Sequence, residues 1–156
     1  MHLPALSISA IFLTIVIVAA SCSRTDVPIV DNDFIEFVGV DSGKVEWTSI
    51  PEENGILTAI LVGDPGEHGP LVARYNIPPN MEIVPHTHRE VRSYTVLGGV
   101  WELGFGEKFD ARSLRSFAQG SYYRLPAGVP HYQRAGPEGA IIQIESIGPD
   151  SFDPIE

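Results

Sequence analysis

The most informative stretch of this sequence is "VPHTHREVRSY", residues 84–94, in which two histidines stand two positions apart. Side chains alternate between the two faces of a β-strand, so every second residue of an unbroken strand projects to the same side. Here those residues are His86, His88, Glu90 and Arg92. Two imidazoles on one face can converge on one cation. Pro85, which lacks a backbone donor, indicates a bulge or a sheet edge at the same point.

The rest of the chain indicates an all-β protein. Short runs rich in Val, Ile, Tyr and Leu alternate with Gly and Pro, and no run has helical spacing over three turns. Gly98-Gly99 separates two of these runs by two residues, which is typical of a hairpin. Many short strands at even spacing predict a sandwich or a barrel. The expected strands span residues 55–63, 71–78, 81–88, 92–97, 100–105, 121–126 and 140–148.

Length and charge narrow the class of protein. A chain of 156 residues corresponds to one domain. Its formal net charge of −10 repels the phosphate backbone of nucleic acids, so we expect no nucleic-acid partner. The expected partner is a small-molecule ligand.

The first 21 residues contain no charged side chain, and "ISAIFLTIVIVAA" at residues 8–20 has the length of a signal-peptide core. An export signal over residues 1–21, as an apolar helix outside the barrel, is the interpretation; an uncleaved membrane anchor is the alternative. Residues 22–33 are polar and read as a tether. The barrel is expected over residues 34–148, and residues 149–156 are expected to form an acidic tail.

The single cysteine, Cys22, follows this leader directly. The stretch "VAASC" resembles the lipobox of bacterial lipoproteins, in which the cysteine becomes the lipid-bearing first residue, although Ala19 stands where that family usually has Leu. The resemblance implies an exported protein of the cell envelope or periplasm, anchored to the membrane only through Cys22. An unmodified cysteine beside an ordinary cleavage site is the alternative.

A second stretch, "GSYYRLPAGVPHYQRA" at residues 120–135, ends one strand, turns, and begins another at His131. Together the two stretches resemble the cupin family over about 56 residues. The first cupin motif has Gly, His-x-His, Glu and Gly in a set spacing. This chain matches it with His86, His88 and Gly99, but has Asn80 in the place of the first Gly and Arg92 in the place of the Glu.

The second cupin motif has Gly, Pro-x-Gly, His and Asn. This chain matches it with Gly120, Pro126, Gly128 and His131, and has Ala135 in the place of the Asn. The resemblance implies a small cupin barrel, which is a double-stranded β-helix or jelly roll. Small cupins often pair, so it also implies a homodimer.

Three histidines fall inside the matched stretches, and His86, His88 and His131 are therefore the expected metal ligands. Imidazoles suit a transition metal rather than Mg or Ca, and we expect a divalent ion such as Fe, Mn or Zn. Three protein ligands leave open positions, as in catalytic sites. The resemblance implies metal-dependent oxygenase or isomerase chemistry on a small organic substrate. If that substrate is anionic, Arg92 is the residue expected to bind it. A non-catalytic binding or sensing cupin with a degenerate, metal-free site is the alternative.

Arg92 leaves three arrangements open, because a guanidinium cannot be a ligand. The three histidines could hold the metal alone, with Arg92 turned away or binding an anionic substrate. Glu90 could supply the carboxylate. The site could also lack metal, with Arg92 paired to Glu90. Tyr94, on the Arg92 face, and Tyr122, before the second motif, are the candidate substrate contacts, with core packing as the alternative.

Overall fold

The computed structural model describes residues 39–50 and 55–155. These residues belong to one of the two units into which the chain divides, residues 37–156. The expected signal helix, Cys22 and most of the expected tether lie outside the described residues. No helix in the described part of the chain is long and apolar enough to cross a membrane.

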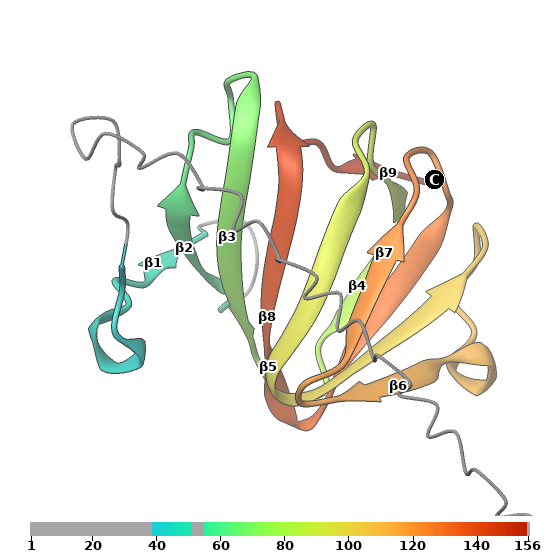
Figure 1. The fold of residues 1–156 in the computed structure, drawn as a ribbon. Helices are drawn as coiled ribbons and strands as arrows, with labels where there is room; N and C mark the ends of the chain where they lie inside the picture. The colour runs from blue at the N-terminus through green and yellow to red at the C-terminus, as the bar shows by residue number, and fades with distance from the viewer. Residues whose placement is uncertain (1–38, 51–54, 156) are drawn as a thin grey trace, which may run out of the picture. The chain divides into compact units, whose positions relative to one another are not determined.

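The described chain is built almost entirely of strands (Figure 1), which confirms the all-β prediction. Two single-turn 3-10 helices, η2 and η3, span Ser42–Lys44 and Ala111–Ser113. The strands are β1 (Thr48–Ser49), β2 (Leu57–Val62), β3 (Gly69–Ile77), β4 (Glu82–Thr87), β5 (Arg92–Phe105), β6 (Arg115–Ala118), β7 (Tyr122–Leu125), β8 (His131–Gly148) and β9 (Asp153–Pro154).

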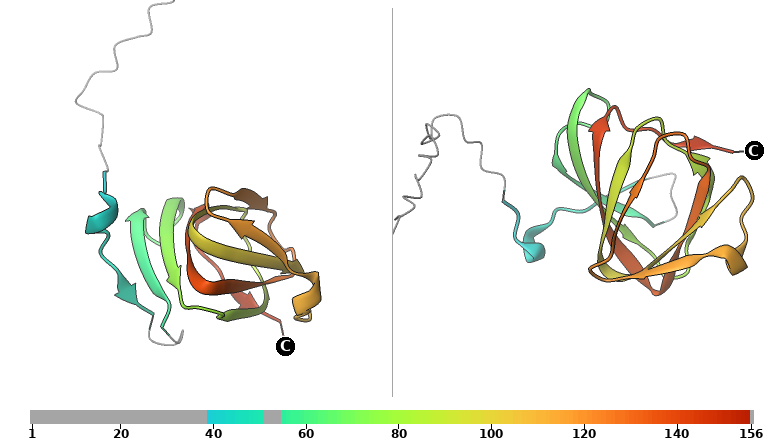
Figure 2. Two further views of the ribbon diagram at one scale, coloured as in Figure 1. Left: turned by 90° about the horizontal axis from the view of Figure 1, so that it is seen from below. Right: turned by 45° about the vertical axis from the view of Figure 1, so that its right-hand side comes forward.

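Two long strands, β5 and β8, organise the sheet. They run antiparallel along most of their length. The first part of β8 also pairs with β4 and its second part with β3, while β5 pairs first with β7 and then with β6. Because each long strand has different partners at its two ends, the sheet curls on itself into a barrel (Figures 1 and 2).

Gly98 and Gly99 do not form the predicted hairpin. Strand β5 continues through both residues, and its register with β8 shifts on either side of them. Gly99 has a φ of 68°, and a Cβ there would lie 2.1 Å from the carbonyl oxygen of Gly139. The pair therefore marks a bulge in a bent strand, where two backbones approach too closely for a side chain.

The core lies inside the curl and is formed by alternate residues of the long strands. Trp101, Tyr94 and Val96 of β5 are each 1% exposed. They pack with residues of β8, β3 and β7, which are Ala135, Ala140, Ile142, Ile144, Ile77 and Leu125. This packing gives the barrel a largely apolar interior in which buried polar side chains need partners.

The last described residues lie against the barrel. Strand β9 pairs with β4, with Pro154 opposite His86 and Asp153 opposite Thr87. The backbone N–H of Ile155 donates to the carbonyl of Pro85 at 2.9 Å. Residues 150–155, which the sequence suggested as part of an acidic tail, thus form a C-terminal strap across β4.

Candidate metal site

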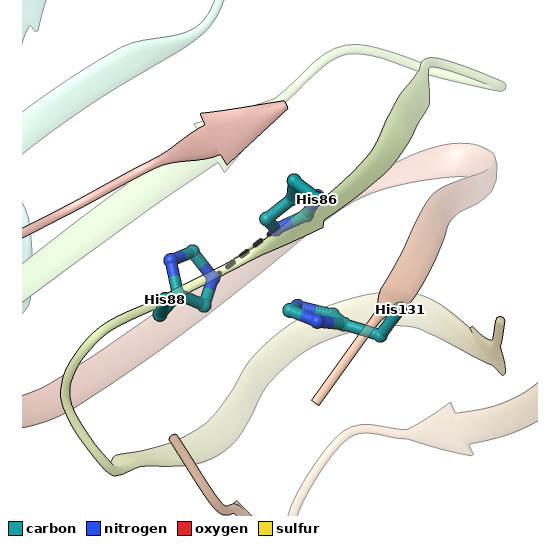
Figure 3. Close-up of side chains that lie close together, drawn as sticks. All are labelled: His86, His88 and His131. Carbon is teal, nitrogen blue, oxygen red and sulfur yellow. Dashed lines mark hydrogen bonds between the residues drawn. The ribbon is translucent and has the colours of Figure 1, made fainter. Parts of the chain in front are cut away.

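Three histidine side chains lie close together (Figure 3). His86 lies on β4, His88 directly follows that strand, and His131 opens β8 opposite His86. Strand β4 ends at Thr87 and a bend precedes β5, so no unbroken strand carries His86, His88, Glu90 and Arg92 on one face. All three rings are nonetheless buried, at 1%, 3% and 0% exposed for His86, His88 and His131.

The tripeptide Val-Pro-His occurs twice in the site and sets two of the rings in the same way. His86 Nδ1 lies 2.7 Å from the carbonyl of Val84, and His131 Nδ1 lies 2.9 Å from that of Val129. Proline has a fixed φ, and in each case it joins the histidine to the carbonyl that its ring contacts. The two histidines lie opposite each other in the pairing of β4 with β8.

The third ring is oriented by more distant residues. His88 Nδ1 lies 2.6 Å from the carbonyl of Ser151 in the C-terminal strap. The carbonyl of His88 accepts a hydrogen bond of 2.7 Å from Gly128 N–H. Gly128 has a φ of 71°, which explains the glycine in the Pro-Ala-Gly turn of the second matched stretch.

These contacts determine where each imidazole carries its proton. A carbonyl oxygen can only accept, so each Nδ1 must donate, and a neutral ring then has a lone pair on Nε2. Burial, helped by the positive charge of Arg92 and by the neighbouring histidines, lowers the pKa of His86 to about 3 and that of His88 to about 4. Burial likewise lowers the pKa of His131. All three rings are therefore neutral at pH 7.

The three lone pairs face one another and fit a metal ion. One ligand nitrogen from each ring lies within 4.8 Å of the others. His86 Nε2 and His88 Nε2 are 3.1 Å apart, which is the spacing of two nitrogens about 2.1 Å from one ion at roughly a right angle. His131 Nε2 is buried and has no hydrogen-bond partner among the described residues. Backbone carbonyls on the opposite ring nitrogens are typical of metal-ligating histidines.

Arg92 is buried beside this cluster and paired with acidic groups. Its Nε donates to Glu90 at 2.7 Å, and its Nη2 donates to Asp150 and, at 2.6 Å, to the carbonyl of Ser151. Only 5% of the residue is exposed. The positive charge that seemed incompatible with a metal site is therefore offset by neighbouring carboxylates.

Glu90 is not part of the histidine cluster. Its carboxylate accepts from Arg92 and, at 2.7 Å, from the hydroxyl of Ser151. Burial raises its pKa, but these hydrogen bonds and the charge of Arg92 outweigh burial and lower the pKa to about 2. Burial raises the pKa of Asp150 to about 6. The structure thus combines two of the expected arrangements, since the histidines converge while Arg92 pairs with Glu90.

The two candidate tyrosines lie in different places. Tyr94 is 1% exposed, and its hydroxyl lies 3.4 Å from His88 Nε2. Burial raises the pKa of Tyr94, so the phenol stays protonated at neutral pH. Tyr122 is 60% exposed and contacts Ser93 at 3.1 Å, and it lines a separate surface cleft rather than the histidine site.

Tyr123, next to Tyr122 on β7, faces inward, as Leu125 does. Its ring stacks on Tyr94 with centroids 4.6 Å apart. Its hydroxyl accepts from Trp101 and from Gln133, both at 3.1 Å. Neither Tyr123 nor Gln133 was predicted from the sequence as a residue of the site. Strand alternation offered a signal for Tyr123, because it shares parity with Leu125, an apolar residue expected to be buried.

A cavity of about 480 Å³ adjoins the histidines, and His86, His88, Arg92 and Tyr94 lie on its wall. Phe152 of the strap also lines it, stacked on His86 with ring centroids 4.3 Å apart. The volume is within the range of small-molecule sites. The sequence analysis missed Asp150, Ser151 and Phe152, and no local pattern distinguishes them from a polar tail.

No protein-family model matches this sequence, and no curated protein matches it. Solved structures do match the fold. KdgF from Halomonas sp. has a TM-score of 0.54 at 18% identity, over 69% of this chain and 93% of that one. The polyketide cyclase RemF from Streptomyces resistomycificus has a TM-score of 0.63 at 18% identity, over 78% of this chain and 87% of that one. An RmlC-like cupin from Shewanella frigidimarina has a TM-score of 0.55 at 16% identity, over 70% of this chain and 89% of that one.

At these identities the likeness establishes the fold. The described chain has the cupin fold, as the two matched stretches predicted.

Proposed function

We propose that this chain is an exported, lipid-anchored cupin that binds a divalent transition metal through His86, His88 and His131. We further propose that it acts on a small organic molecule in the adjoining cavity. The proposal is carried by one observation. The Nδ1–H groups of three buried imidazoles donate hydrogen bonds to backbone carbonyls, so the three Nε2 lone pairs lie close together. A buried lone pair without a partner, such as that of His131 Nε2, is costly, and a cation bound by the three Nε2 atoms would satisfy it.

The chemistry of the site supports a catalytic role. A divalent transition metal bound there supplies a Lewis acid that polarises an oxygen of the bound molecule. Tyr94 can donate a hydrogen bond toward the same region, because its protonated hydroxyl lies beside His88. Tyr123 and Gln133 hold one another and the Tyr94 ring in place. RemF, which shares the fold, is named a polyketide cyclase, which also supports an enzymatic role.

Metal analysis tests the first part of the proposal. Protein purified from its native compartment should contain about one equivalent of Fe, Mn or Zn, and the same metal should raise the melting temperature of chelator-treated protein. At a free metal concentration of 100 Kd the stabilisation is about 2.7 kcal/mol. The variant H131A should lose the metal and the shift, whereas H68A, in a surface loop, should retain both. A metal-free protein that no divalent ion stabilises would leave a non-catalytic binding barrel as the better explanation.

Export and anchoring rest on the apolar leader and on Cys22. We expect the mature chain to begin at Cys22 with acyl chains on that residue, since several chains give stable attachment to a membrane. Mass spectrometry of the mature N-terminus decides this. An unmodified Cys22, or a mature chain that begins elsewhere, would contradict the anchor and leave the metal site unaffected.

A further inference from the structure

The charge around Arg92 decides which ligands the cavity can accept. Arg92 is the one cation that lines the cavity in the described part of the chain. A free guanidinium there would attract a carboxylate or phosphate, as the sequence analysis supposed for an anionic substrate. Its fork, however, is already directed at Glu90, Asp150 and the carbonyl of Ser151.

Without a bound metal, the balance of charge in this group leaves no surplus positive charge for an anionic ligand. Glu90 alone neutralises Arg92, and Asp150 adds a second carboxylate to the same guanidinium. The group is therefore neutral if Asp150 carries a proton and negative if it does not. A ligand carboxylate would have to displace one of these partners, which are held by the strap and by Ser151. Bringing a like charge next to them is costly.

Most of the cavity wall away from the histidines is apolar. Aliphatic and aromatic side chains contributed by β3, β4, β5 and β8 and by the turn before β4 form it, among them Ile77, Met81, Ile83, Trp101, Ile142 and Ile144. Ile77, Trp101 and Ile142 are at most 3% exposed, so this wall belongs to the core of the barrel. The wall also carries polar side chains: Tyr94, whose hydroxyl lies 3.4 Å from His88 Nε2, and Tyr75, Glu82 and Gln133. Such a wall favours burial of a ring or an aliphatic skeleton.

We infer that the ligand of this cavity is an uncharged, largely apolar small molecule with a ring-sized skeleton and one polar group that faces the histidines. The Arg92–Glu90–Asp150 group excludes carboxylates and holds the strap, and it is not an anion receptor. This inference rests on the proposed function for the metal-facing end of the ligand. The apolar wall and the charge balance are observed independently of the metal.

Two probes of the same shape test the inference. 2-Naphthamide and 2-naphthoate differ in charge at pH 7 but hardly in size, and D-glucose is an uncharged but hydrophilic comparison. In titration calorimetry with chelator-treated protein we expect the amide to bind at least about tenfold more tightly than the carboxylate. Glucose should not bind. Tighter binding of the carboxylate, or equal binding of glucose and the amide, overturns the inference.

A change of specificity sharpens the test. The double variant E90Q/D150N leaves the charge of Arg92 uncompensated, and the ratio of amide to carboxylate affinity should fall by at least about tenfold. The matched control E107Q/E138Q removes two exposed carboxylates and should leave the ratio unchanged. An unchanged ratio in a folded E90Q/D150N protein contradicts the role given to this group. If that variant does not fold, the wild-type comparison still decides.

The metal and ligand results can be told apart. Zinc binding is measured separately by competition with a chromogenic chelator. Amide binding without zinc binding supports the inference and refutes the proposed metal site. If the protein binds zinc but the chelator-treated protein prefers the carboxylate, the proposed metal site is supported and the inference is refuted.

Discussion

At the scale of single residues, the Nδ1 atoms of the three histidines and the Arg92 guanidinium all have hydrogen-bond partners, whereas His131 Nε2 has none among the described residues. Backbone carbonyls accept hydrogen bonds from the Nδ1–H groups of the three histidines. Arg92, which stands where the cupin motif has Glu, donates to Glu90. The convergence of the three histidines was predicted from the sequence, and Arg92 was noted there in the place of the cupin Glu. Its burial among two carboxylates was not predicted, because Asp150 lies 58 positions further along the chain.

Replacing Arg92 tests the energetic role of this group. R92M should lower the free energy of unfolding by about 3 kcal/mol or more, because Glu90 and Asp150 then remain partly buried without a cation. Urea unfolding at pH 7 measures the change. The control R112M removes an ion pair whose arginine side chain is 92% exposed, and it should change stability by less than about 1 kcal/mol. Similar losses in both variants would contradict the structural importance of Arg92.

At the scale of elements, the strap and the bent strand β5 differ most from the sequence-based expectations. The glycine pair was predicted to form a hairpin, and this prediction was wrong. A turn and a bulge use the same residue type, and which one forms depends on the partner strand. Here β8 pairs with β5 on both sides of the glycines, so the strand continues.

Removing the strap should weaken metal binding. A chain that ends at Pro149 loses the carbonyl of Ser151 that orients His88, and we expect metal affinity to fall about 10- to 100-fold. Competition with a chelator of known affinity measures it. F152A keeps the backbone and loses only the ring stacked on His86, so its affinity should remain within about threefold of the parent. Equal losses in the two proteins would show that the ring, and not the carbonyl, sets the site.

At the scale of the whole molecule, burying three neutral histidines makes stability depend on pH. Their pKa values are lowered on folding, so the unfolded chain binds more protons than the folded chain below pH 6.5. The free energy of unfolding should therefore fall as the pH falls from about 6.5 toward 4. Asp150, whose pKa is raised to about 6, opposes this trend, but it is one group against three.

Denaturant titrations of chelator-treated protein from pH 7.5 to 4.5 test this dependence. The slope should steepen in D150N, because the opposing group is removed, and it should be shallower in H131A. Flat stability across this range would mean that the rings take up protons in the folded state and that the barrel does not hold them neutral.

The sequence by itself determined the strand-rich pattern, the cupin resemblance and the three histidines. Alternation along strands and the spacing of turn residues are local properties that a single chain displays. Closure of the barrel decided the rest: which residues pair with Arg92, that Tyr123 and not Tyr122 faces inward, and that residues 150–155 complete the site. Those contacts join Glu90, Arg92 and His88 to residues 58 to 63 positions away. Only the packing of distant segments against one another brings them together, and no local pattern records it.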